Sequence, residues 1–213
     1  GRGERGEGRG EELPTPAYDA YTYRPTVGIT GGLWSGGVPF GLPTDQRPDA
    51  LYSLNYTTAP LDKPLAIIGA PKVVLHVSST APVMAFVARL CDVAPDGTSA
   101  LVCNGVLNAT RRQSLTHPTP LTPNEVYELT IDLDCTAWHF KPGHRIRLSI
   151  CSADFPNLWP TPYPGVNRVY RDVDHPSRLI LPVMPLRKTV NDSLPTDEAA
   201  FERLESAVNV YRL

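Results

Sequence analysis

Apolar and polar residues alternate with a period of two in several segments that follow residue 50. In "KVVLHVSS", residues 72–79, Val73, Leu75 and Val77 share one face. The segments "YELTIDL" and "RIRLSI" repeat the same pattern. Successive side chains of a strand point to opposite sides of a sheet, so each alternation predicts a half-buried strand.

Two longer runs of β-forming residues, "VMAFVARLCDV" and "SALVCNGVLNA", lie on either side of "APDGT". An Asp-Gly pair between apolar runs predicts a β-hairpin. Gly105 lies inside the second run, where a glycine indicates a β-bulge. A last strand is expected near 179–183. Seven or eight strands separated by Pro and Gly turns predict an all-β fold, a jelly-roll β-sandwich.

The sequence divides into four parts on these patterns. Residues 1–16 are predicted to be a low-complexity tail or linker, because they are rich in Gly, Arg and Glu and poor in apolar residues. Residues 17–50 have no periodicity and are expected to form a long irregular arm, of the kind used between domains. Residues 51–185 hold the predicted sandwich. Residues 186–213 form a C-terminal extension.

The C-terminal extension is expected to contain a short helix. Thr196 is placed to cap it, and acidic residues follow in its first turn. Ala200, Phe201, Leu204 and Val208 form an apolar stripe at helical spacing. Such a helix would need an apolar surface against which to pack.

Composition excludes several classes of function. The 20 basic and 22 acidic residues are nearly balanced, which disfavours nucleic acid and anionic membranes as partners. No apolar run reaches the ~20 residues of a membrane-spanning helix, and no signal peptide is recognisable. The sequence begins with Gly1 and not Met, so we expect it to be part of a longer protein. The 23 prolines and 16 glycines suit many short strands joined by turns.

The four cysteines show no CxxC spacing and all lie in apolar, strand-like segments, which predicts buried free thiols. Cys91 and Cys103 are expected to be neighbours across the hairpin, where the geometry disfavours a disulfide. Buried free thiols favour a reducing compartment, and therefore the cytoplasm. The set is Cys91, Cys103, Cys135 and Cys151.

One stretch, "FKPGHRIRLSICSADFP" at 140–156, combines the residue types of a catalytic triad. On a strand, however, His144 and Ser149 point to opposite faces, so they cannot form the hydrogen bond that a nucleophile and its base require. "GGLWSGG" resembles a nucleophile elbow only superficially, since neither a strand nor a helix flanks it. No catalytic residue is assigned.

Metal and cofactor sites are not indicated either. The five histidines lack the spacing of a metal-binding motif, and no glycine-rich phosphate loop joins a strand to a helix. The aromatic residues Trp34, Phe155 and Trp159 lie in Gly- and Pro-rich loops. Aromatic side chains in such loops suit stacking against a sugar or packing against a neighbouring domain.

Five segments, in order, resemble the C-terminal non-catalytic domain of X-prolyl dipeptidyl-peptidases and related esterases and acylases. "YTYRPTVGITGG" is similar to an arm motif of that family, and "FVARLCDVAPDGTSALVCNGVL" to its hairpin. "FKPGHRIRLSICSADFP" resembles the family pattern F-x-x-G-H-R-I-R-L-x-I-S-S-[SA]-[DN]-F-P. The other two segments are "DQRPDALYSLNYTTAPLDKPLAIIGAPKVVLHVSST" and "HPSRLILPVMP". Arg24, Asn108 and Cys151 depart from the usual residues, which puts local contacts in doubt but not the fold.

This resemblance, which covers about 17–185, implies a galactose-binding-domain-like jelly roll. In the family the Ser, Asp and His triad lies upstream in an α/β-hydrolase domain. This chain would then be an accessory domain that packs on the catalytic domain of the same parent protein and helps to shape the substrate cleft. Trp34, Asp154, Phe155 and Trp159 are the candidate contacts. Two alternatives stay open: a free-standing carbohydrate-binding module, and an oligomerisation module that forms a homo-oligomer.

Overall fold

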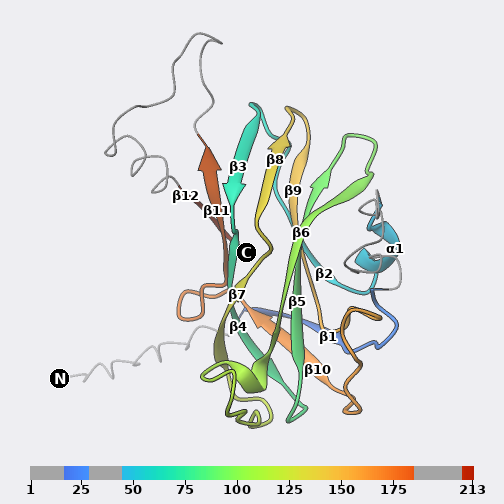
Figure 1. Cartoon of the computed structure of the whole chain (residues 1–213), viewed down its shortest axis with the longest axis vertical. Helices are drawn as coiled ribbons and strands as arrows, with labels where there is room; N and C mark the ends of the chain where they lie inside the picture. Colours follow the sequence, from blue (N-terminus) through green and yellow to red (C-terminus); the bar gives the residue numbers. More distant parts are fainter. Residues whose placement is uncertain (1–16, 29–44, 185–207) are drawn as a thin grey trace, which may run out of the picture.

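The computed structural model describes residues 17–28, 45–184 and 208–213, which form two antiparallel β-sheets (Figure 1). The larger sheet has eight strands and the smaller has four. This arrangement confirms the predicted all-β sandwich. The single α-helix of the described part, α1 (Arg47–Ala50), is short, and no helix within these ranges is long and apolar enough to cross a membrane.

The eight-stranded sheet has the order β1-β10-β4-β11-β3-β8, with β7 paired to β4 and β12 paired to β11. The four-stranded sheet has the order β2-β9-β5-β6. In chain order the strands are β1 (Tyr18–Thr22), β2 (Leu54–Thr57), β3 (Leu65–Gly69), β4 (Lys72–Ser79), β5 (Ala85–Val93), β6 (Ser99–Asn108), β7 (Tyr127–Asp132), β8 (Thr136–Phe140), β9 (Arg145–Cys151), β10 (Val166–Tyr170), β11 (Arg178–Met184) and β12 (Val208–Arg212); a short 3₁₀ helix, η2 (Ala109–Arg111), follows β6.

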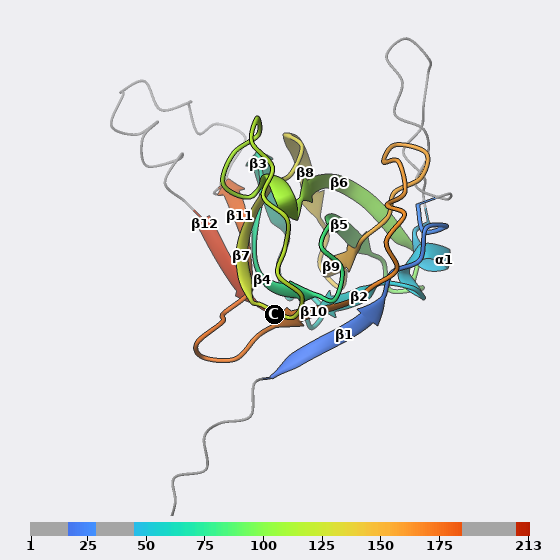
Figure 2. The same ribbon diagram turned by 90° about the horizontal axis from the view of Figure 1, so that it is seen from below.

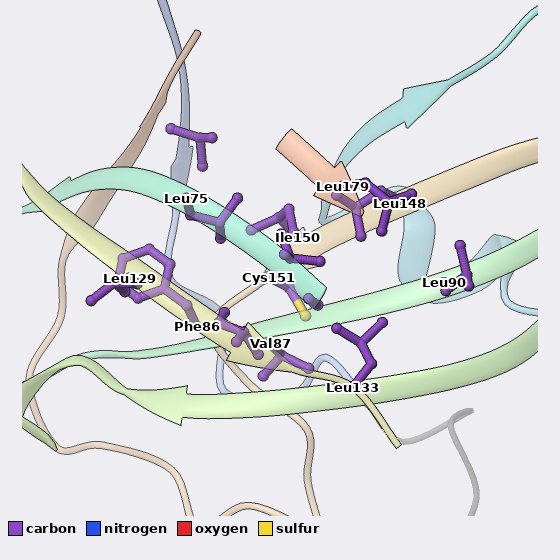
Figure 3. Close-up of a cluster of buried hydrophobic side chains, with 14 of the residues drawn as sticks. Leu75, Phe86, Val87, Leu90, Leu129, Leu133, Leu148, Ile150, Cys151 and Leu179 are labelled. Carbon is purple, nitrogen blue, oxygen red and sulfur yellow. The ribbon is translucent and has the colours of Figure 1, made fainter. Parts of the chain in front are cut away.

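Apolar side chains from the two sheets meet in one buried core (Figure 3). Leu75 and Leu129 come from the eight-stranded sheet, and Phe86, Leu148 and Ile150 from the four-stranded sheet. All five are no more than 1% exposed. The faces expected from the alternation at 72–79, 127–133 and 145–150 are therefore the faces that the core buries.

The expectation of a wholly irregular arm at 17–50 is wrong at both of its described ends. Residues 18–22 form strand β1, which pairs with β10 in a register that joins Tyr18 to Tyr170. Residues 47–50 form helix α1. The edge position of β1 explains the missing sequence signal, because only alternate residues of this short strand are even half-buried.

The expected C-terminal helix is contradicted at Val208, which begins strand β12 and pairs with Pro182 of β11. The rest of the predicted helical stripe lies outside the described residues. Strand β12 lies along the edge of β11 opposite the edge that pairs with β4 (Figure 2). The helical spacing was misleading here because Val208 and Val210 also fit the period of a strand.

The predicted hairpin is confirmed as β5 and β6, which pair antiparallel over their whole length. The irregularity in their register falls at Leu90/Cys91 and not at Gly105, so the bulge was assigned to the wrong place. A Cβ on Gly105 would lie 2.3 Å from the carbonyl oxygen of Asp132. Glycine is needed at this position because the backbone at the end of β7 comes too close for a side chain.

All four cysteines are free thiols, and Cys135 is exposed, contrary to the expectation that all are buried. Burial raises the pKa of the Cys91 thiol to about 11 and that of Cys103 to about 12. Burial also raises the pKa of Cys151. Because the thiolate is the reactive form, the three buried thiols should be inert in the folded chain.

We therefore expect one fast-reacting thiol in the folded chain and four after unfolding. The measurement is a titration with Ellman's reagent at pH 8, with and without guanidinium chloride. A Cys135→Ser variant should lose the fast phase and keep the slow one. Rapid reaction of more than one thiol in the folded chain would contradict the burial of Cys91, Cys103 and Cys151.

Candidate functional site

A buried charge cluster lies on the side of the four-stranded sheet that faces away from the eight-stranded sheet. The side chain of Arg89, on β5, is 3% exposed. Its Nη2 donates to Oδ1 of Asp154 at 2.5 Å, and its Nη1 donates to Oδ2 of Asp49 at 3.3 Å. One buried cation thus holds two carboxylates, which offset the cost of removing it from water.

The two carboxylates fix two segments that have little regular structure of their own. Asp49 belongs to α1, which lies beside the four-stranded sheet in both views (Figures 1 and 2). Asp154 begins the turn that follows β9, and Asn157 donates its side-chain amide to the other carboxylate oxygen. Arg89 therefore fastens both α1 and the turn after β9 to the same sheet.

The arm closes over this turn at Gly28. The N–H of Phe155 donates to the carbonyl of Val27, and a Cβ on Gly28 would lie 2.5 Å from Cα of Asp154. Gly28 has a φ of 109°, which side-chain-bearing residues rarely adopt. Only glycine fits at this contact between the arm and the turn.

The turn directs aromatic side chains outward. The peptide bond between Phe155 and Pro156 is cis. Phe155 is 38% exposed and Trp159 is 84% exposed, and their rings meet edge-on with centroids 6.5 Å apart. Tyr163 is also exposed further along the same loop. An indole that is so exposed buries little of its surface within this chain and contributes little to its stability.

The structure separates the four residues predicted as contacts. Phe155 and Trp159 lie together and are exposed, as a contact surface requires. Asp154 is only 2% exposed, so it positions the loop and does not itself face a neighbour. Trp34 lies outside the described residues.

The residues whose types resemble a catalytic triad form hydrogen bonds with separate partners. Ser149 donates its hydroxyl to Oδ1 of Asn55 at 2.6 Å. Nδ1 of His144 lies 2.8 Å from Oδ1 of Asp92, and the indole N–H of Trp138 donates to Oδ2 of the same carboxylate at 3.0 Å. The first bond joins β9 to β2, and the two contacts of Asp92 join β5 to β8 and to the residue before β9, so all of them have a structural role. Within the described ranges, no group of His, Cys, Asp and Glu is arranged to hold a metal ion.

Sequence reasoning missed Arg89, Asp49 and Gln46. An arginine in the middle of the apolar run "FVARLCDV" was the available signal, because such a residue must find a buried partner. Gln46 is 2% exposed, and neither polar atom of its side chain has a hydrogen-bond partner in the described structure. It lies beside α1, on the segment that leads to Asp49.

Comparison with known proteins assigns the chain to a family. Residues 11–180 match the family model described as the X-Pro dipeptidyl-peptidase C-terminal non-catalytic domain. The chain belongs to this family. The match covers β1 to the first three residues of β11, including Arg89, Asp154 and the aromatic loop, and it leaves out β12.

Relatives of the family domain are parts of larger hydrolases. The chain is 34% identical over 188 residues to the cocaine esterase of Rhodococcus sp. (strain MB1 Bresler), covering 80% of this chain and 33% of that protein. An α-amino-acid ester hydrolase is similar in structure, with a TM-score of 0.62, 25% identity and coverage of 78% of this chain and 32% of that one. An aminopeptidase from a marine sediment archaeon (Thaumarchaeota archaeon) shares the fold, with a TM-score of 0.73, 23% identity and coverage of 81% and 34%. The chain thus spans about a third of the length of the proteins it matches.

The charge cluster is expected to contribute to the stability of this domain. Asp154→Asn leaves Arg89 with one carboxylate in a buried site and should lower the free energy of unfolding by about 3 kcal/mol. The matched control is Asp132→Asn, which breaks the exposed Lys72–Asp132 pair and should change the free energy of unfolding by less than about 1 kcal/mol. Urea unfolding followed by circular dichroism measures both. Equal losses in the two variants would show that Arg89 does not depend on Asp154.

Proposed function

We propose that this chain is the accessory β-sandwich of a serine hydrolase, and that it packs on the α/β-hydrolase domain of the same parent protein and helps to shape the substrate cleft. The family match and the cocaine esterase relative support this assignment. The observation that carries the docking surface is the exposed pair of Phe155 and Trp159 on a loop held in place by a buried charge cluster.

The physical case for this docking surface rests on pre-organisation. Trp159 belongs to a loop whose start is anchored by Asp154, so less backbone freedom is lost when the loop binds. Tryptophan is also one of the residues enriched among those that dominate the binding energy of protein interfaces. An exposed indole on a fixed loop is therefore suited to insert into a pocket of a neighbouring domain.

The activity of the parent protein is proposed at the level of its relatives. These include proteins named as an esterase, an amino-acid ester hydrolase and an aminopeptidase. The parent is therefore proposed to hydrolyse an acyl ester or an amide, either as a dipeptidyl-peptidase or as an esterase or acylase. The catalytic Ser, Asp and His would belong to the other part of that protein. A homo-oligomer of the parent is proposed as well.

The assignment predicts that the purified chain has no hydrolase activity of its own. Hydrolysis of p-nitrophenyl acetate and p-nitrophenyl butyrate should not exceed the rate in buffer that contains a non-enzymatic protein. Phenylmethylsulfonyl fluoride should therefore change nothing. Turnover that this serine reagent abolishes would place a nucleophile within the chain and overturn the proposal.

Docking is tested by comparing the chain alone with the whole parent protein. Hydroxyl-radical footprinting should label Phe155 and Trp159 readily in the isolated chain and much more slowly in the parent, because the catalytic domain would cover them. Leu115 and Val173 are exposed in other loops and serve as internal controls whose labelling should not change. Equal labelling of Trp159 in both proteins would exclude this loop from the interface.

The exposure of Trp159 also favours one alternative, a carbohydrate-binding module. An indole face can stack on the apolar face of a sugar ring. A glycan array probed with the chain and with Trp159→Ala separates the two functions. Binding that the variant loses, together with an unprotected Trp159 in the parent, would favour the carbohydrate module over domain docking.

A further inference from the structure

Strand β4 changes its pairing partner at His76. Its ladder with β10 ends where His76 pairs with Tyr170, and its ladder with β11 begins at Arg178. The chain between these two ladders, residues 171–177, leaves the sheet as the loop that joins β10 to β11 (Figure 2). The backbone N–H of His76 donates to Oγ of Ser177 at 2.9 Å, so the end of the loop supplies the hydrogen bond that a ladder partner would accept.

Two histidine rings form the contact between this loop and β4. The rings of His76 and His175 meet edge-on, with centroids 5.6 Å apart, and the ring of Tyr170 lies 5.5 Å from that of His175. Within the loop, Oδ1 of Asp172 accepts the backbone N–H of His175 at 2.7 Å and lies 3.1 Å from Nδ1 of the same residue. The loop is therefore folded on Asp172 and rests on β4 through His175.

The two ring nitrogens of His76 have different surroundings. The side chain is only 11% exposed, and Nε2 lies 3.2 Å from Oε2 of Glu128 on β7. Because a carboxylate only accepts hydrogen bonds, Nε2 carries the proton of the neutral ring and Nδ1 carries a lone pair. Nδ1 is buried and has no hydrogen-bond partner in the described part of the chain. A second proton would have to bind at this nitrogen, in a position that offers it no acceptor.

The charges that face His76 come from β7, the loop and β11. Burial lowers the pKa of His76 below its ordinary value, and the charges of His175 and Arg178 act in the same direction. Glu128 and Asp172 act in the opposite direction. The side chain of Glu128 is 57% exposed, however, so water screens its attraction, and Asp172 forms an ion pair with His175 when that ring is protonated. Protonation of both rings would therefore place two cations in contact.

The loop at 171–177 also holds the two edge strands of the larger sheet. At its start, the backbone N–H of Arg171 donates to the carbonyl of Ala17, and the guanidinium pairs with Asp19 of β1. At its end, the carbonyl of Ser177 accepts from the backbone N–H of Leu213, directly after β12. A displacement of the loop from β4 would therefore weaken the attachment of β1 at its start and of β12 at its end.

We propose that the loop at 171–177 is a pH-sensitive latch, closed on β4 while His76 is neutral and released when His76 takes up a proton. In the released loop the ring is hydrated, and its pKa returns toward the ordinary value of about 6.5. The pKa is lower in the closed loop than in the released one. The closed form therefore has its full stability above about pH 6.5 and loses it progressively as the pH falls below that value.

Amide hydrogen exchange of the full 213-residue chain measures the release. The protection factor of the His76 amide, which Ser177 holds in the closed loop, should fall by up to about tenfold for each pH unit below 6.5, because release takes up one proton. The amide of Leu90, in the middle of β5 and paired on both sides, is the internal control and should change much less. A protection factor of His76 that does not depend on pH, or that falls only in step with that of Leu90, would overturn the proposal.

Substitution separates His76 from the other ionisable groups. His76→Phe keeps a planar aromatic ring that cannot take up a proton, so the pH dependence of protection at position 76 should disappear. His117→Phe is the matched control, because His117 lies in an exposed loop where its ring contacts Thr116, and it should keep the full dependence. An unchanged pH dependence in His76→Phe would exclude His76 as the group that controls the loop.

A measurement on the unaltered chain covers the case in which His76→Phe does not fold. The Cε1–H resonance of His76, followed by NMR as a function of pH, should titrate with a midpoint below about 6.5. A midpoint at or above that value would mean that the closed loop tolerates the proton, and the latch would be ruled out.

Discussion

The buried guanidinium of Arg89 is the constraint on which the placement of the irregular segments depends. Removing a cation from water has a large unfavourable free energy unless carboxylates compensate for it. The two that do so come from positions 40 and 65 residues away along the chain, Asp49 in α1 and Asp154 after β9. If α1 or the turn after β9 packed elsewhere, the guanidinium of Arg89 would lose one of its two carboxylates. The two contacts of Arg89 therefore select one position for α1 and one for the turn after β9. The arm packs against that turn at Gly28.

The sandwich itself was predictable because its strands carry their own signal. The alternation in β4, β7 and β9 reflects one buried and one less buried face, and the Asp-Gly turn marks the β5–β6 hairpin without reference to the rest of the chain. These are local consequences of strand geometry. They also sufficed to show that His144 and Ser149 do not act together, since residues five positions apart on a strand point to opposite sides.

Features that depend on distant partners were not predictable. Strand β1 exists because its backbone completes the edge of β10, about 150 residues later, and its own residues are mostly exposed. Strand β12 pairs with β11 although its first residue, Val208, also fitted a helical stripe. Asp154 was expected at a contact surface, since the sequence does not reveal that Arg89 lies opposite it. Gly105 was assigned to a bulge for the same reason: the close carbonyl belongs to Asp132, on another strand.

The aromatic loop follows strand β9, and the way this strand is held bears on how the loop is presented. The turn at Asp154 begins just after the strand ends at Cys151. A movement of the turn that is transmitted through β9 would require the strand to have two alternative arrangements. Strand β9 pairs with β2 on one edge and with β5 on the other, and its apolar residues are fully buried in the core. A register shift would move those residues out of the core and would break both ladders. A strand so constrained has one arrangement, so the turn at Asp154 that follows it, and with it the start of the aromatic loop, is held in one position on the sheet.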